Sequence, residues 1–388
     1  MKKIIFITNE LIYGGVEKSL LSLINNINRE RYDITIGVLK KGGILENKFP
    51  QNIKIIETPQ INDSIKNILL NDLKNAKFIS IIYRLIYLIR CNLTKDYNKS
   101  CNYRSKIYDK FDGKYDMAIC FHKPTDLPVA YVINNINAKK KVLWLHMELK
   151  NISEGERDSY YKIFNRYDEL ICVSESIKKQ LLLIFPEFHK KATVIYNIVE
   201  ADKIKRLSKI GYKLNIDDNY IKILTVARLS PEKGHDLIID TAKYLIDKKY
   251  TNFKWYIVGD GPLREILNNR IKKEGLEEVI ILLGEVDNPY GYFSSCDIYI
   301  QPSLEEGFGI TVSEAKLFYK PVIVTNFATS KEHIENNITG YIVDFSYKEI
   351  AEKIKYLIDS PLKRDEFSMN LKYKEKQNNF NDIKEIFD

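Results

Sequence analysis

Short apolar runs alternate with helix-patterned segments along almost the whole chain of 388 residues. The runs are too short for buried helices and rich in Ile and Val, which is typical of strands covered on both faces. Parallel strands need a crossover between them, so the alternation predicts an α/β fold of strand–helix–strand units. In the first half, strands are expected at Lys3–Thr8, Asp33–Val38, Ile53–Glu57, Tyr115–Phe121, Lys141–His146, Glu169–Val173 and Thr193–Tyr196.

The strand pattern restarts after an interval, residues 200–220, that is polar and rich in Lys and Asp. We therefore predict two Rossmann-like domains, residues 1–198 and 199–371, since the chain is long enough for two cores. Residues 372–388 are expected to form a crossover helix that returns to the first domain. The second series of strands is expected at Ile221–Ala227, Phe253–Val258, Val279–Leu283, Asp297–Gln301, Pro321–Thr325 and Tyr341–Val343.

Composition excludes several classes of protein. Five cysteines without a Cys-x-x-Cys pair argue against a disulfide framework and a zinc knuckle, and suit a reducing compartment. The first apolar run is too short for a signal peptide, and no stretch approaches the ~20 apolar residues of a membrane span. These features predict a cytoplasmic protein.

The formal net charge of +8 is concentrated in one segment, residues 74–110. This segment carries nine Lys or Arg against two Asp, an excess of seven, together with many aliphatic and aromatic residues. One interpretation is a surface that lies on an anionic membrane, at the inner face of the plasma membrane. The other is a buried helix with a solvated basic rim, and the pattern favours neither. No nucleic-acid-binding motif accompanies the charge, so no nucleic-acid partner is expected.

The segment 305–314, EEGFGITVSE, joins a Gly-Phe-Gly turn to two acids, Glu306 and Glu314. The glycines let the main chain approach a ligand closely. Residues 311–314, Thr-Val-Ser-Glu, have the form of a capping box, so we expect a helix to begin there with unpaired N–H groups toward the turn. Such a helix end favours phosphate or a hydroxyl-rich group. The alternative is an ordinary loop-to-helix junction with solvated acids.

Other loops that follow expected strands are also candidates, because ligands of open parallel sheets bind at the carboxyl ends of strands. Gly14 and Gly15 come at the start of the first expected helix. They either let a phosphate approach the backbone or simply form a tight turn. Arg228 and Lys233 follow the first strand of the second series. Two cations at that position can neutralise a diphosphate, although isolated surface cations are common.

Cofactor and metal signatures are incomplete. Gly259 and Gly261 form half of a dinucleotide-binding turn, but Arg264 stands where the third glycine is required, which argues against NAD or FAD. His146 ends an expected strand, where a binding role and an ordinary hydrogen-bonding role are both open. The other histidines lack metal-ligand spacing, and the chain has no Asp-x-Asp, so neither a cofactor nor a metal is expected.

Taken together and in this order, these segments resemble the retaining glycosyltransferases of the GT-B fold, family 4 (glycosyl transferases group 1). The resemblance covers nearly the whole chain. It rests on the Glu306–Glu314 pair within Pro302–Glu314, on Arg228, Lys233-Gly234, Val258–Pro262, Gly14-Gly15, Ile171–Ser174 and Thr339–Tyr341. It implies two facing Rossmann-like domains with parallel sheets and an interdomain cleft.

The resemblance also implies roles for individual residues. Arg228 and Lys233 would hold the donor diphosphate, and Glu314 would accept the ribose hydroxyls. Glu306 would lie beside the donor sugar and support positive charge at the anomeric carbon. The implied catalytic residues are thus Glu306, His146, Arg228 and Lys233. Further donor contacts are implied for Gly14, Gly15, Gly259, Gly284, Glu285, Phe308, Gly309 and Ile310.

The function implied is hexosyl transfer (EC 2.4) with retention, from a UDP- or GDP-sugar to a hydroxyl of a glycan or lipid-linked glycan. Cell-surface polysaccharide biosynthesis is the expected setting. The departing phosphate would take the proton, so neither a protein base nor a metal is implied. Loop 327–330 departs from the family, because it lacks the glycines often found before the acid at Glu332.

Two other functions remain open. A nucleotide-sugar epimerase of similar fold would need an acid/base pair near the sugar, for which His146 and Glu306 are the available residues. A non-enzymatic sugar- or lipid-binding scaffold is the third hypothesis. The presence of all the residues that the resemblance implies for donor binding argues against a scaffold.

Overall fold

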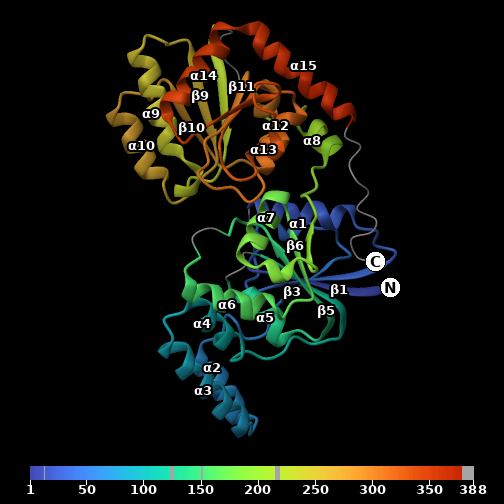
Figure 1. The fold of residues 1–388 in the computed structure, drawn as a ribbon. Coiled ribbons are helices and arrows are strands. Elements are labelled where there is room, and N and C mark those ends of the chain that lie inside the picture. The colour runs from blue at the N-terminus through green and yellow to red at the C-terminus, as the bar shows by residue number, and fades with distance from the viewer. Residues whose placement is uncertain (13, 123–125, 150–151, 215–218, 378–388) are drawn as a thin grey trace. The chain divides into compact units, whose positions relative to one another are not determined.

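The chain folds into two units, each built on one parallel sheet, as seen in a computed structural model (Figure 1). Unit 1 comprises Met1–Ile198, and unit 2 begins at Val199. The structure describes residues 1–12, 14–122, 126–149, 152–214 and 219–377.

Unit 1 contains a seven-stranded sheet with the order β3-β2-β1-β4-β5-β6-β7, and every neighbouring pair is parallel. Its strands are β1 (Lys2–Thr8), β2 (Tyr32–Val38), β3 (Lys54–Glu57), β4 (Tyr115–Phe121), β5 (Ala138–Leu145), β6 (Glu169–Cys172) and β7 (Ala192–Val194). Its α-helices are α1 (Gly15–Asn26), α2 (Ile65–Lys74), α3 (Phe78–Leu93), α4 (Tyr97–Ser105), α5 (Leu127–Asn135), α6 (Glu154–Phe164) and α7 (Glu175–Ile184).

Unit 2 contains a six-stranded parallel sheet with the order β10-β9-β8-β11-β12-β13. Its strands are β8 (Ile221–Val226), β9 (Phe253–Val258), β10 (Ile280–Gly284), β11 (Ile298–Gln301), β12 (Val322–Thr325) and β13 (Gly340–Val343). Its α-helices are α8 (Ala201–Leu207), α9 (His235–Asp247), α10 (Arg264–Lys273), α11 (Tyr290–Ser295), α12 (Ile310–Leu317), α13 (Ser330–His333), α14 (Tyr347–Asp359) and α15 (Pro361–Gln377).

The sheet of unit 2 is buried on both faces, as its continuous apolar strands require. In β9, Phe253, Trp255 and Ile257 belong to one hydrophobic cluster, which also contains side chains of α9, α10 and α14. Tyr256 and Val258 point the other way, into a second cluster with side chains of α11 and α12. The alternation along one strand therefore joins two layers of helices through the sheet.

The predicted α/β fold with two Rossmann-like parallel sheets is confirmed. Strand bounds differ by small amounts: the strand expected at Thr193–Tyr196 is β7, Ala192–Val194. Residues 372–377 continue α15, which already begins at Pro361. The remainder of the expected crossover helix, 378–388, lies outside the described residues.

Candidate functional site

The strand order of unit 2 reverses between β8 and β11, which are parallel neighbours. Successive strands run outward in opposite directions from this point, so the loops that follow β8 and β11 leave the same edge of the sheet. These loops, residues 227–234 and 302–309, contain the candidate cations and one candidate acid. The fold thus places both at the position where open α/β sheets bind ligands.

The main chains of the two loops are held together. The N–H of Leu304 donates to the carbonyl of Glu232 over 2.8 Å. Gly234 has φ +67°, and a Cβ there would lie 2.0 Å from the carbonyl oxygen of Pro302. A larger residue would therefore both strain the backbone and separate the loops.

Lys233 and Glu306 form an ion pair across this junction. The Lys233 Nζ lies 2.8 Å from Glu306 Oε1, and the two side chains are only 20% and 10% exposed. The same oxygen accepts from the Ser303 hydroxyl at 2.8 Å and from the Gln301 amide at 3.0 Å. These partners restrict the carboxylate of Glu306 to one position at the sheet edge, because each fixes the same oxygen.

Gln301 is a positioning residue that the sequence analysis did not identify. It ends β11, is 1% exposed, and its amide oxygen accepts from the hydroxyls of Tyr299 and, at 3.1 Å, Thr311. Its amide nitrogen meanwhile donates to Glu306. A polar residue at the end of an apolar strand run was the available signal.

The capping-box prediction for residues 311–314 is wrong. The helix α12 begins at Ile310, after Gly309 with φ +86°, and it has no side-chain cap. The expected capping side chains have tertiary partners instead: Thr311 donates to Gln301, and Glu314 accepts from the Tyr290 hydroxyl at 3.1 Å. Within the described part of the chain, the N–H groups of Gly309 and Ile310 form no hydrogen bond. The start of α12 therefore retains donors for an anion.

Glu314 belongs to the same helix, α12, and is 3% exposed. Its carboxylate contacts the Tyr290 hydroxyl. Burial, followed by the charge of Glu314, raises the pKa of Tyr290 well above its ordinary value, so the phenol remains a hydrogen-bond donor to the carboxylate. The Tyr290 hydroxyl thus helps to hold the Glu314 carboxylate in place.

The Gly-Phe-Gly turn is tethered from the other side by His333. Its Nε2 lies against the carbonyl oxygen of Phe308, which also accepts from the Thr329 hydroxyl at 3.1 Å. Burial, with the nearby charge of Lys316, lowers the pKa of His333 to about 4. The ring is therefore neutral near pH 7, with a proton available for Phe308. This role of His333 was not predicted, because in the sequence His333 was considered only for metal-ligand spacing.

The free energy of unfolding should fall as pH drops from 6.5, the ordinary histidine value, toward the folded-state pKa of His333 near 4. The reason is that the unfolded chain then binds the proton that the folded chain excludes. At about pH 5 the expected loss from His333 is about 2 kcal/mol. Urea titrations at about pH 7 and about pH 5 measure it. In His333→Gln the drop should shrink, whereas His189→Gln, at an exposed site, should leave it unchanged. An equal drop in all three proteins would contradict the assignment.

Gly259 and Gly284, two of the residues implied to contact the donor, are in contact with each other. The N–H of Gly259 donates to the carbonyl of Gly284 at 2.8 Å. A Cβ on Gly259, which has φ +138°, would lie 2.0 Å from the Ala227 carbonyl oxygen. Gly259 is therefore required for packing against the β8 loop. Glu285 and Arg228 are exposed beside these strand ends.

The remaining candidates, Gly14, Gly15 and His146, belong to unit 1. Gly15 begins α1, and Gly14 precedes it in an extended conformation, φ −149°. His146 follows β5, is 8% exposed and stacks against Trp144 with an interplanar angle of 8°. Burial lowers the pKa of His146 to about 3, and its Nε2 has no hydrogen-bond partner among the described residues. This buried nitrogen is therefore available to a ligand.

Metal binding was not expected. The described residues contain no cluster of three or more His, Cys, Asp or Glu side chains able to hold a metal ion. Their five cysteines are unpaired thiols, and burial raises the pKa of Cys120, Cys172 and Cys296.

Comparison with solved structures supports this architecture. The chain superposes on a complex of Anabaena HepE with UDP-glucose with a TM-score of 0.69, at 19% identity, covering 97% of this chain and 95% of HepE. The chain has the GT-B fold. Residues 209–376 match the model of the family "Glycosyl transferases group 1".

Curated relatives match over part of their length. An uncharacterized glycosyltransferase of Methanocaldococcus jannaschii is 30% identical over 60% of this chain and 62% of its own length. The capsular polysaccharide biosynthesis glycosyltransferase CapM of Staphylococcus aureus is 28% identical over 52% of this chain and 55% of its own. A third relative, from Campylobacter jejuni, is 29% identical over 47% of this chain and 48% of its own length. Its name is N-acetylgalactosamine-N,N'-diacetylbacillosaminyl-diphospho-undecaprenol 4-alpha-N-acetylgalactosaminyltransferase. The chain thus spans about half to three fifths of these relatives.

Proposed function

We propose that this GT-B chain is a retaining glycosyltransferase of the hexosyltransferase type, which moves a sugar from a UDP- or GDP-sugar to a hydroxyl of a glycan. The observation that carries this proposal is the ion pair of Lys233 with Glu306 at the strand-order reversal of unit 2, beside the uncapped start of α12. Cation, carboxylate and free N–H groups at one sheet edge suit a ligand that carries both phosphates and hydroxyls.

In this proposal the donor is bound mainly by unit 2. Lys233 and Arg228 neutralise the diphosphate, and Arg228 is free to turn toward it because its side chain is exposed. Glu314 accepts the ribose hydroxyls. The nucleotide base of the donor lies against Gly259, Gly284 and Glu285. The backbone N–H groups of Phe308, Gly309 and Ile310 donate hydrogen bonds to phosphate or sugar oxygens.

The proposed catalytic step is substitution at the anomeric carbon with retention. The acceptor oxygen forms a bond to that carbon from the side of the leaving group, the bond to the phosphate oxygen breaks, and the departing phosphate takes the acceptor's proton. Lys233 stabilises the negative charge that develops on the phosphate, and Glu306 the positive charge on the sugar. His146 and the Gly14–Gly15 turn of unit 1 supply further contacts to sugar and diphosphate.

The acceptor in this proposal is a glycan or lipid-linked glycan of cell-surface polysaccharide biosynthesis. CapM is named for capsular polysaccharide biosynthesis, and the Campylobacter relative is named for a diphospho-undecaprenol acceptor. We place the protein at the inner face of the plasma membrane as a peripheral protein, with residues 74–110 toward the anionic surface. No helix in the described ranges is long and apolar enough to cross a membrane.

A panel of UDP-, GDP- and ADP-sugars tests donor binding, because a ligand that binds only the folded chain raises its melting temperature. Glu314→Ala should lower donor affinity by roughly 10-fold or more, through lost charge-assisted hydrogen bonds. Glu278→Ala, at a side chain 97% exposed, is the matched control.

The donor that binds is then incubated with and without lipid-linked acceptors, and products are followed by NMR. An α-linked product from an α-linked donor is the expected result. A new epimer without acceptor would identify an epimerase instead. Binding without turnover across the acceptors would favour a scaffold.

A further inference from the structure

Helix α3 exposes the apolar side that a soluble helix normally buries. Ile79, Ile82, Ile86, Ile89 and Leu93 recur every three or four residues, so they form one stripe along the helix. Their exposed fractions are 86%, 60%, 45%, 58% and 79%. The interpretation of residues 74–110 as a buried helix is therefore wrong. A stripe of this length is too continuous to be the scattered apolar exposure of an ordinary surface.

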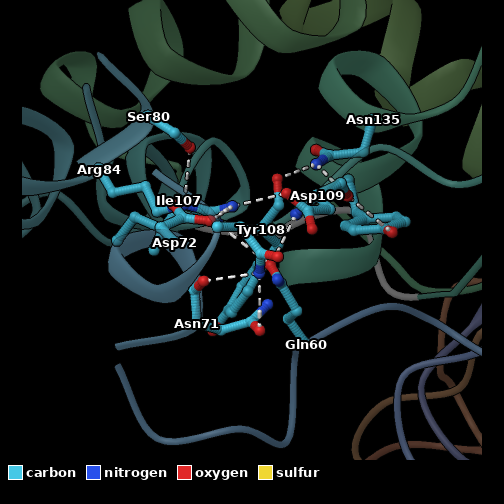
Figure 2. A network of polar contacts seen from close by, with 11 residues as sticks. Gln60, Asn71, Asp72, Ser80, Arg84, Ile107, Tyr108, Asp109 and Asn135 are labelled. Atoms are coloured by element: carbon cyan, nitrogen blue, oxygen red, sulfur yellow. Dashed lines mark hydrogen bonds and ion pairs between the residues drawn. The ribbon is translucent and has the colours of Figure 1, made fainter. Parts of the chain in front are cut away.

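The opposite side of α3 carries Arg84, the residue of this helix that is buried, and Figure 2 shows it within a network of polar contacts. Arg84 is 4% exposed, and its Nε lies 2.7 Å from a carboxylate oxygen of Asp72 on α2, which is 1% exposed. Its Nη2 lies 2.6 Å from Asp109, and its Nη1 donates to Gln60 at 3.0 Å and to the carbonyl of Ile107.

Every nitrogen of this guanidinium is therefore engaged, as burial of a charge requires. The contacts determine which side of the helix faces inward. Rotating α3 to bury the isoleucines would move Arg84 away from Asp72 and leave a buried carboxylate without its cation, a change that costs several kcal/mol. The network thus holds the apolar stripe outward.

The charges around the stripe have one sign. Lys74, Lys77 and Arg90 are exposed next to it. The two acids of residues 74–110 are both in ion pairs: Asp96 with Lys99, and Asp109 with Arg84. The surface that carries the stripe is therefore apolar and positively charged, which is complementary to an anionic lipid surface.

We propose that the α3 stripe is the membrane-docking face, which lies in the interface of an anionic bilayer with the five apolar residues among the acyl chains. This rests on and deepens the proposed function, since it specifies how the enzyme reaches a lipid-linked acceptor. With 16 residues, α3 is about 24 Å long, too short to span the ~30 Å hydrocarbon core, and its Arg84 side excludes a spanning orientation. If two copies met at this face, their segments 74–110, each with an excess of seven positive charges, would repel one another. This repulsion disfavours self-association.

Co-sedimentation with vesicles tests the proposal without donor or acceptor. The probe is the full chain with vesicles of phosphatidylcholine, with or without phosphatidylglycerol. We expect binding that requires phosphatidylglycerol, and Ile79→Ser/Ile86→Ser should weaken it roughly 100-fold, because two apolar side chains would no longer be transferred from water to the acyl chains. The matched control is Leu183→Ser/Leu362→Ser, at side chains 74% and 84% exposed outside α2–α4, and it should bind as the unaltered chain does.

Several results would overturn docking. These are no binding of the unaltered chain, equal binding by the isoleucine variant and the control, or an isoleucine variant that converts a dimer to a monomer, which would identify a second copy as the occupant. Donor thermal shifts of the isoleucine variant should equal those of the unaltered chain. If the isoleucine variant loses vesicle binding but keeps its donor thermal shifts, the result supports docking separately from the proposed function. If the unaltered chain binds vesicles but shows no donor thermal shift, only the proposed function is refuted.

Discussion

Replacing Lys233 by methionine lowers kcat/KM for sugar transfer by roughly 10²–10³-fold, which is the usual cost of removing one preorganised electrostatic contact to a developing charge. Methionine keeps the unbranched stem but has no charge for the departing diphosphate. It also leaves Glu306 without the cation 2.8 Å away. Steady-state kinetics with the donor found by thermal shift measure the effect.

The matched control is Lys254→Met. Its side chain is also 20% exposed and lies in unit 2, but on β9, where its partner is Glu278. It should change kcat/KM by less than about twofold, since surface substitutions away from a site are nearly neutral. Comparable losses in both variants would mean that Lys233 acts only through the stability of unit 2.

The loss of kcat/KM caused by Lys233→Met should overlap with the loss caused by replacing Glu306. Because the two residues form one ion pair, Lys233→Met and Glu306→Gln should be strongly non-additive, and the double variant should lose far less than the product of the two single losses. Full additivity would indicate separate roles in which the contact between them is incidental.

Replacing Arg84 by leucine lowers the free energy of unfolding of the α2–α3 region by about 3–5 kcal/mol, the usual cost of removing one partner of a buried ion pair. Asp72, at 1% exposure, would lose its cation and remain buried. Hydrogen exchange of the α2 and α3 amides measures this locally, which is preferable because a chain of two units need not unfold in one step.

Arg90→Leu is the control for this prediction, because Arg90 is on the same helix but exposed. It should change the local stability by less than about 0.5 kcal/mol. The double variant Arg84→Leu/Asp72→Leu should recover much of the loss, since it removes both buried charges. Protection of α2 and α3 that is unchanged in Arg84→Leu would show that the network does not hold the helix.

The fold was predictable because its signal is periodic and repeated. Continuous apolar runs such as Phe253–Val258 satisfy only a strand that is covered on both faces, and β9 has those bounds. The candidate residues were identified by their position after such strands. Their contacts were not predictable, since Lys233 and Glu306 are far apart in the chain, and the roles of Gly14, Gly15, His146 and the other donor residues stay predictions.

Local motifs were less dependable than the strand pattern. The sequence at 311–314 satisfies the rules of a capping box, yet Gln301 and Tyr290 engage the side chains of Thr311 and Glu314. A tertiary hydrogen bond in a buried site is stronger than an exposed capping bond, because no water competes for it. Propensity rules do not contain such partners.

The two parallel-sheet units and the loops that carry cations and acids follow from the sequence, because burial of alternating strands and helices leaves few other arrangements. Three features emerge only in the folded chain: Lys233 pairs with Glu306, α12 starts uncapped at Ile310, and α3 exposes a stripe of five apolar residues. One cause accounts for all three. A charged or polar side chain loses its water on burial and must find partners, here Glu306, Gln301 and Asp72, each of which lies on another element of the fold.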